Sequence, residues 1–182
     1  MKKLFWIILL VLSSVSFLVD KQLSIFIPNN RPLILNKFFE FIINYLPAAL
    51  FLAAIFAYML FKKRKLIIPY SISLLASAAI TVSLKYLIGR PRPFVLLALE
   101  KMHGISYFFD LWNSSFPSWH TVSLFLIIPF IGMKYKPYWL AVAVIIALSR
   151  IYSGVHYLSD VLFGALLGYL ISKIALKYFS KE

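Results

Sequence analysis

Three short clusters in this sequence hold residue types that bind and cleave phosphate esters. They are KYLIGRPRP (Lys85 to Pro93), FPSWH (Phe116 to His120) and SRIYSGVHYLSD (Ser149 to Asp160). Each lies at the end of an apolar segment, where an ionisable group is costly unless it serves a function. Together they provide cations for phosphate oxygens, and imidazoles for nucleophilic attack and proton transfer. We therefore expect the three clusters to form one site.

In the third cluster, His156 and Asp160 are four residues apart, which places them on one face of a helix. A carboxylate at one ring nitrogen fixes the tautomer and makes the other nitrogen a better nucleophile. Arg150 precedes them across Ser153-Gly154, which is expected to interrupt the helix. Its planar guanidinium suits two phosphate oxygens. For this cluster alone, a structural Arg–Asp pair with a histidine capping a helix is an equally good interpretation.

The second cluster is expected to begin a helix. Pro117 and Ser118 stand directly before an apolar run, and free backbone amides at a helix start bind anions. His120 falls in the first turn, where an imidazole can give a proton to a leaving oxygen and later take one from water. A plain helix cap is the alternative role for Ser118.

The first cluster closes an apolar segment with Lys85, Arg90 and Arg92. Its prolines stiffen the exit and hold the arginines near the membrane surface. Lys85 lies within the last turn of the segment, so it either snorkels outward or points into a cavity. Headgroup anchoring is the alternative role for the two arginines.

The composition indicates an integral membrane protein. Of the 182 residues, 62% are hydrophobic, which argues against a soluble domain. The chain has no cysteine, and this excludes disulfides, thiolate metal ligands and a cysteine nucleophile. The net charge of +13 does not indicate nucleic acid, because the lysines fall between the apolar segments. That placement is typical of membrane topology and of contact with anionic headgroups.

The apolar segments predict an all-α polytopic membrane protein, a six-transmembrane-helix bundle in a single domain over residues 1–182. Several approach the length of about 20 residues that spans a bilayer. The connection Phe94–Ser115 is expected to lie as a helix at the membrane interface. The six segments are Leu4–Val19, Phe38–Phe61, Leu66–Ile88, Phe116–Met133, Tyr138–Val155 and Tyr157–Phe179.

The positive charges predict the orientation of these segments. With the N-terminus inside, eleven of the 19 Lys and Arg residues lie on the inner side, as the positive-inside rule requires. Both termini are then cytoplasmic, and all three clusters fall on the outer face. In a bacterium this corresponds to the inner membrane, with the site facing the periplasm.

The three motifs resemble the signature of the type 2 phosphatidic acid phosphatase family, in its order and spacing. The resemblance implies a membrane lipid phosphatase. The matching residues are Lys85-(six residues)-Arg92-Pro93, Pro117-Ser118-x-His120 and Ser149-Arg150-(five residues)-His156-(three residues)-Asp160.

The resemblance also implies a role for each residue. His156 would attack phosphorus to give a phosphohistidine, with Asp160 orienting its ring. His120 would protonate the leaving oxygen and then activate the hydrolytic water. Neither a cofactor nor a metal is expected, because the cations neutralise the phosphate. The phosphate-binding residues would be Lys85, Arg92, Ser118 and Arg150, together with nearby backbone amides.

Two further residues are predicted to contact the substrate or the interface. Trp119 stands where the family usually has glycine, and its side chain would form a wall for the lipid, an interface anchor or packing between helices. The family pattern separates Arg90 from Arg92, so headgroup anchoring is assigned to Arg90. His103 has no assigned role.

The expected substrate is a lipid with a phosphate at the membrane surface, and lipid A 1-phosphate is the first choice. Undecaprenyl diphosphate and phosphatidylglycerophosphate are the alternatives, and transfer of the phosphate to an alcohol is a related reaction. A non-enzymatic transporter or anion channel would explain the cations but not the two histidines. An inactive scaffold is disfavoured because every charged or histidine position of the signature is filled. No nucleic acid or obligate protein partner is expected.

Overall fold

Helices make up the regular secondary structure of this protein. The computed structural model describes residues 3–30, 32–45, 48–95 and 114–179, and within these ranges there is no β-strand, only an isolated bridge between Pro91 and Ser114. The predicted all-α class is confirmed. The α-helices are α1 (Lys3–Ser16), α2 (Asp20–Asn29), α3 (Leu33–Tyr45), α4 (Ala48–Lys62), α5 (Ile67–Ile88), α7 (Trp119–Ile127), α8 (Lys136–Tyr152) and α9 (Leu158–Phe179). Short 3₁₀ turns are found at Arg64–Leu66, Ile128–Phe130 and Met133–Tyr135.

Two helices in the described ranges are long and apolar enough to cross a membrane. They are Arg64–Ile88 and Leu158–Phe179. The pair Ile7–Ser16 and Asp20–Asn29, bent by 73°, adds a third if it forms one broken span. The other apolar helices are shorter. The count of six spans and the outward-facing site therefore stay predictions.

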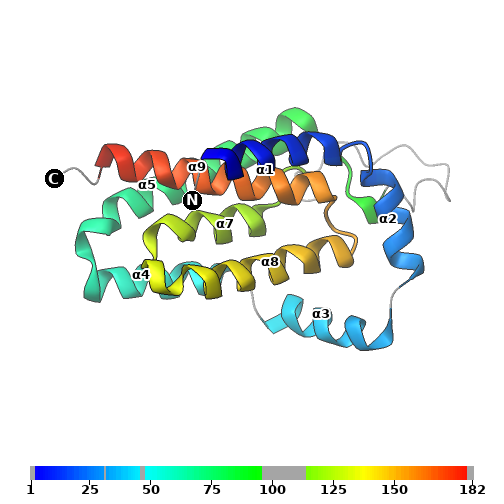
Figure 1. Cartoon of the computed structure of the whole chain (residues 1–182), viewed down its shortest axis with the longest axis horizontal. Helices are drawn as coiled ribbons and strands as arrows, with labels where there is room; N and C mark the ends of the chain where they lie inside the picture. The colour runs from blue at the N-terminus through cyan, green and yellow to red at the C-terminus, as the bar shows by residue number, and fades with distance from the viewer. Residues whose placement is uncertain (1–2, 31, 46–47, 96–113, 180–182) are drawn as a thin grey trace.

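Two helices are described within the predicted segment Phe38–Phe61. They are α3, which ends at Tyr45, and α4, which begins at Ala48, and α3 lies at the edge of the bundle in Figure 1. The two residues between them lie outside the described ranges.

Large apolar side chains cover much of the outside of the bundle. Phe61 on α4 is 80% exposed, and on α5 Leu75 is 72% and Leu87 is 76% exposed. An apolar surface of this kind is unfavourable in water, whereas the hydrocarbon core of a bilayer solvates it. The chain is therefore an integral membrane protein.

Helix α7 forms the centre of the bundle. All its residues from Thr121 to Ile127 are buried, and Figure 1 shows it between α9 and α8. A helix that is apolar around its whole circumference belongs in a core. Because α7 contacts α4, α5, α8 and α9, the helix is held in place from several directions.

Two glycines allow α7 to approach α9 closely. A Cβ atom at Gly164 would lie 3.0 Å from the carbonyl oxygen of Ser118, and one at Gly168 would lie 2.1 Å from that of Val122. The second distance is far below van der Waals contact, so only glycine fits there. This packing sets the distance between the start of α7 and the start of α9.

We expect Gly168→Ala to lower the free energy of unfolding by roughly 1–3 kcal/mol, because the added methyl group overlaps a backbone carbonyl. The midpoint of thermal unfolding in detergent measures this effect. Gly132→Ala is the matched control, since its Cβ would lie 3.8 Å from the ring of Tyr135, an ordinary contact. Equal midpoints for the two variants would contradict the close packing of α7 on α9.

Four helix ends meet at one end of the bundle. They are the C-terminal ends of α5 and α8 and the N-terminal ends of α7 and α9 (Figure 1). Between α8 and α9 the chain turns through Gly154, whose φ of 75° lies in the left-handed region that favours glycine. The predicted interruption at Ser153-Gly154 is confirmed, because α8 ends at Tyr152. All three sequence clusters thus arrive at the same end.

Candidate active site

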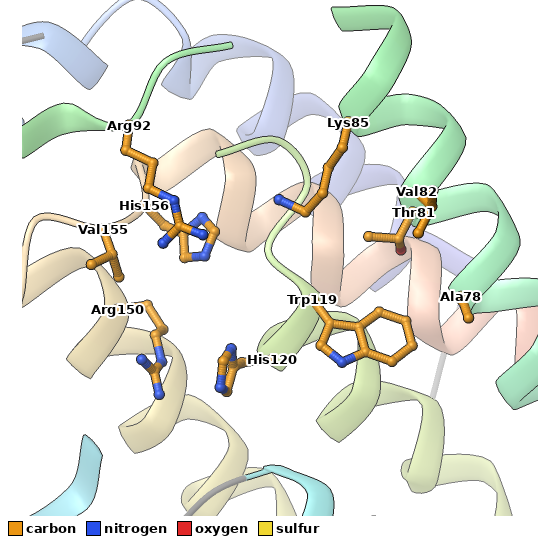
Figure 2. A pocket seen from close by; sticks show the side chains of 10 residues that line it. All are labelled: Ala78, Thr81, Val82, Lys85, Arg92, Trp119, His120, Arg150, Val155 and His156. Atoms are coloured by element: carbon orange, nitrogen blue, oxygen red, sulfur yellow. The ribbon is translucent and has the colours of Figure 1, made fainter. Parts of the chain in front are cut away.

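A cavity of about 430 Å³ opens where these helix ends meet. Figure 2 shows Lys85 and Arg92 extending toward the same space, one from α5 and the other from the chain that follows it. Each of the three sequence clusters contributes side chains to the wall. The lining residues are Lys85, Arg92, Trp119, His120, Arg150 and His156, together with Ala78, Thr81, Val82 and Val155.

Hydrogen bonds connect the segments that carry the cavity-lining residues. The amine of Lys85 donates to the carbonyl of Ser114, and the Ser114 hydroxyl donates to the Lys85 carbonyl at 3.1 Å. The amide of Phe94 donates to the carbonyl of Gly154 at 3.1 Å. This second bond ties the segment that carries Arg92 to the turn between α8 and α9. Because an ammonium group has three donors, Lys85 keeps donors for a ligand.

Arg92 and Arg150 bring buried donors to the cavity. The Nε of each has no hydrogen-bond partner among the described residues, and buried donors without an acceptor cost free energy. Burial lowers the pKa of Arg92 from its ordinary value, while the Asp160 carboxylate opposes that shift. A guanidinium nevertheless stays protonated in proteins. The two arginines therefore suit an anion with several acceptor oxygens, such as phosphate.

His156 does not lie on the helix that carries Asp160. It belongs to the turn before α9, while Asp160 lies in the first turn of that helix. His156 Nδ1 is 3.5 Å from Asp160 Oδ2, and within the described part it makes no hydrogen bond of standard geometry. A proton on Nδ1 would face the carboxylate and leave Nε2 with the free lone pair. The predicted pairing is thus present as a 3.5 Å contact, although the turn brings it about and not a shared helix face.

The surroundings of His156 favour its neutral form. The residue is buried, and burial lowers the pKa of its imidazole below that of an ordinary histidine, while the Asp160 carboxylate acts in the opposite direction. Desolvation is the larger cause, because a charged ring loses its hydration. A neutral imidazole is the form that can act as a nucleophile at neutral pH.

His120 lies in the first turn of α7 and lines the cavity, as the sequence predicts. Ser118 does not. It is fully buried, and its Oγ accepts a hydrogen bond from Thr121 at 3.1 Å. Its amide donates to the Asp160 carbonyl at 3.1 Å. The predicted phosphate contact of the Ser118 side chain is therefore corrected: close packing of α7 on α9 turns this residue inward.

Trp119 lines the cavity together with Ala78 and Val82 of α5 (Figure 2). These neighbours give the cavity an apolar part beside the cationic one. Trp119 is also the first residue of α7, a right-handed helical position that any L-residue can adopt. The absence of the family's glycine therefore requires no unusual backbone here.

Arg90 does not point outward to headgroups. Its Nη1 donates to Asp160 Oδ1 at 2.8 Å, and its Nη2 donates to Asp20 Oδ2 at 2.7 Å. The predicted interface contact is corrected, because two buried carboxylates hold the guanidinium inside the protein. Asp20 was missed from the sequence, although an acidic residue beside an apolar segment is a signal in a chain with six acids.

Most of the expected interfacial helix Phe94–Ser115, including His103, lies outside the described residues. In the ranges that the structure covers, no group of three or more His, Cys, Asp or Glu side chains is arranged to hold a metal ion.

The fold and the cavity together define a class of protein, a helical membrane protein with a cationic, histidine-bearing site at one end of its bundle. The family model described as the PAP2 superfamily matches residues 66–182. The chain therefore belongs to the PAP2 superfamily, and the resemblance to the type 2 phosphatidic acid phosphatases is confirmed. It is a membrane protein of a phosphatase family.

Two relatives illustrate this membership. The crystal structure of Aquifex aeolicus LpxE is similar with a TM-score of 0.69 and 27% sequence identity, over 88% of this chain and 96% of that chain. The bacitracin transport permease protein BcrC of Bacillus licheniformis is 48% identical over 61 residues, which make up 32% of this chain and 30% of that protein. The second match thus spans less than a third of the relative's length.

Proposed function

We propose that this protein is a membrane lipid phosphatase that cleaves a phosphate monoester or diphosphate headgroup through a phosphohistidine intermediate. The observation that carries the proposal is one cavity in which two imidazoles meet three cationic side chains. Membership of the PAP2 superfamily supports the same chemistry.

The reaction has two steps. In the first, Nε2 of His156 forms a bond to phosphorus as the bond from phosphorus to the leaving oxygen breaks, and protonated His120 gives its proton to that oxygen. Asp160 stabilises the positive charge that appears on the His156 ring. In the second step, a water oxygen attacks phosphorus, His120 takes the proton of the water, and the phosphorus–nitrogen bond breaks. Phosphate leaves, and both imidazoles return to their starting states.

Lys85, Arg92 and Arg150 bind the nonbridging oxygens in this proposal. Positioned cations stabilise the charge on those oxygens in the transition state, and a dry cavity strengthens the interaction. Backbone amides at the start of α7 add donors. We therefore propose that the reaction needs no metal ion.

The substrate is a lipid whose tails stay in the bilayer while its phosphate enters the cavity. The apolar wall beside Trp119 supports a hydrophobic substrate. We propose lipid A 1-phosphate as the first candidate, which the likeness to LpxE over most of the chain favours. Undecaprenyl diphosphate is the second candidate, which the local match to BcrC favours. Phosphatidylglycerophosphate is the third.

A transporter is the alternative from another class. The name of the Bacillus licheniformis relative describes a transport permease, and the same cations would bind a phosphate headgroup without cleaving it. Such a protein has no use for a neutral imidazole beside a carboxylate, so we propose the enzyme.

Release of inorganic phosphate by the purified protein tests the proposal. The protein in detergent is given lipid A, undecaprenyl diphosphate, phosphatidylglycerophosphate and phosphatidate, each with and without EDTA. We expect phosphate release from at least one lipid, at the same rate with the chelator. Binding of these lipids without any release would favour the transporter, and loss of activity in EDTA would contradict a metal-free reaction.

A further inference from the structure

A buried cluster of charges lies behind Asp160, outside the cavity. At its centre is Arg90, whose Nη1 donates to Asp160 Oδ1 at 2.8 Å and to Ser159 Oγ at 2.6 Å. Its Nη2 donates to Asp20 Oδ2 at 2.7 Å. One guanidinium therefore joins the first turn of α9 to the first residue of α2.

The two carboxylates of this cluster have little access to water. Asp160 is 0% exposed and Asp20 is 2% exposed, while the side chain of Arg90 is 20% exposed. A buried carboxylate is strongly unfavourable without a countercharge, and Arg90 supplies it for both. The guanidinium also lies 3.8 Å from the ring centroid of Tyr157 and 5.0 Å from that of Phe17. These rings limit its movement.

Asp20 also binds the start of α9 directly. Its Oδ1 accepts a hydrogen bond from the Ser159 amide at 3.1 Å, and its Oδ2 accepts one from the Ser159 hydroxyl. A carboxylate at the N-terminal end of a helix satisfies free amides and interacts favourably with the helix dipole. Asp20 lies where the chain bends by 73° between α1 and α2. The N-terminal helices are thus fastened to the turn of α9 that carries Asp160.

These contacts leave the Asp160 carboxylate little freedom. Its Oδ1 accepts from Arg90, and its Oδ2 accepts from the Tyr157 amide at 2.9 Å. The same Oδ2 lies 3.5 Å from His156 Nδ1. A small rotation of the carboxylate would therefore change the contact that orients the imidazole.

We infer that Asp20 and Arg90 are positioning residues. They hold the Asp160 carboxylate in the position from which it contacts His156 Nδ1. The inference rests on the proposed phosphatase function, in which His156 is the nucleophile. Neither Asp20 nor Arg90 is among the residues that line the cavity. Both therefore act on the rate of phosphoryl transfer through Asp160, and not on the binding of the phosphate.

The test is Asp20→Asn in the full chain, assayed with the best lipid substrate of the panel above. The amide keeps the size and one acceptor oxygen of the side chain but removes its charge. We expect kcat to fall by on the order of tenfold, as for a small displacement of a catalytic group, with KM unchanged. The variant Ser16→Ala is the control, because it removes a buried hydroxyl in the same N-terminal region that donates only to the Ser13 carbonyl.

A double-mutant cycle with Arg90→Gln separates positioning from general destabilisation. The rates are expressed per mole of monodisperse protein recovered from size-exclusion chromatography, so that misfolded protein does not contribute. We expect the fold losses in kcat not to multiply in the double variant, because both residues act through one carboxylate. If Arg90→Gln does not fold, Asp20→Asn alone tests the positioning role, through a lower kcat with an unchanged KM.

Different results would overturn the positioning role of Asp20 and Arg90 and the proposed phosphatase function. An active wild type with an unchanged kcat in Asp20→Asn would overturn the positioning role and leave the phosphatase in place. A rise in KM equal to the loss in kcat/KM would also overturn it. Absence of phosphate release by the wild type would overturn the proposed function and the positioning role together.

Discussion

Replacing His156 with alanine is expected to lower kcat by at least about 10⁴-fold, because the substitution removes the proposed nucleophile. The structure places this imidazole in the wall of the cavity, with Nδ1 3.5 Å from Asp160 Oδ2. The measurement is phosphate release from the best lipid substrate. It is paired with alkaline quenching, which preserves the acid-labile phosphohistidine of the wild type and shows its absence in the variant.

The control for this variant is Ser153→Ala in the same turn. Its hydroxyl donates to the Arg150 carbonyl at 3.2 Å and does not line the cavity. We expect kcat to stay within about twofold of the wild type, as for a substitution away from the reacting groups. Phosphate release by His156→Ala at a rate near that of Ser153→Ala would remove His156 from the mechanism.

Replacing His120 with asparagine is expected to lower kcat for a lipid phosphate by about 10²–10⁴-fold, the usual contribution of a positioned acid or base. His120 would act as the acid in the first step and as the base in the second, so its loss affects the two steps differently. With p-nitrophenyl phosphate the leaving group needs no proton, and the first step should still occur. The phosphohistidine should then accumulate, because the attacking water has no base.

Rapid mixing of this variant with p-nitrophenyl phosphate provides the measurement. We expect a burst of nitrophenolate, followed by slow turnover. Ser123→Ala is the control on the same helix, since its buried Oγ has no hydrogen-bond partner in the described part and does not line the cavity. An equal loss with both substrates and no burst would assign His120 a role other than proton transfer.

Much of the candidate site was predictable from local sequence patterns. The motifs and the order of the apolar segments predicted that Lys85, Arg92 and Arg150 lie at the same end of the bundle as His120 and His156. Such predictions work because a helix end and the residues beside it are set by the nearest few residues. The count of six spans stays a prediction, since two helices of the described ranges, or three with the bent pair, are long and apolar enough to cross a membrane.

The sequence by itself determined that this is an all-helical membrane protein, and it identified the residue types that can bind and cleave a phosphate. Only the tertiary structure decided what binds the motif residues that do not face the cavity. Arg92 lines it, whereas Arg90, two residues earlier, binds Asp20 and Asp160 on the far side. Ser118 matches the motif but is packed against α9. The physical reason is that the direction of a side chain depends on contacts between segments far apart in the chain, which neither spacing nor hydropathy records.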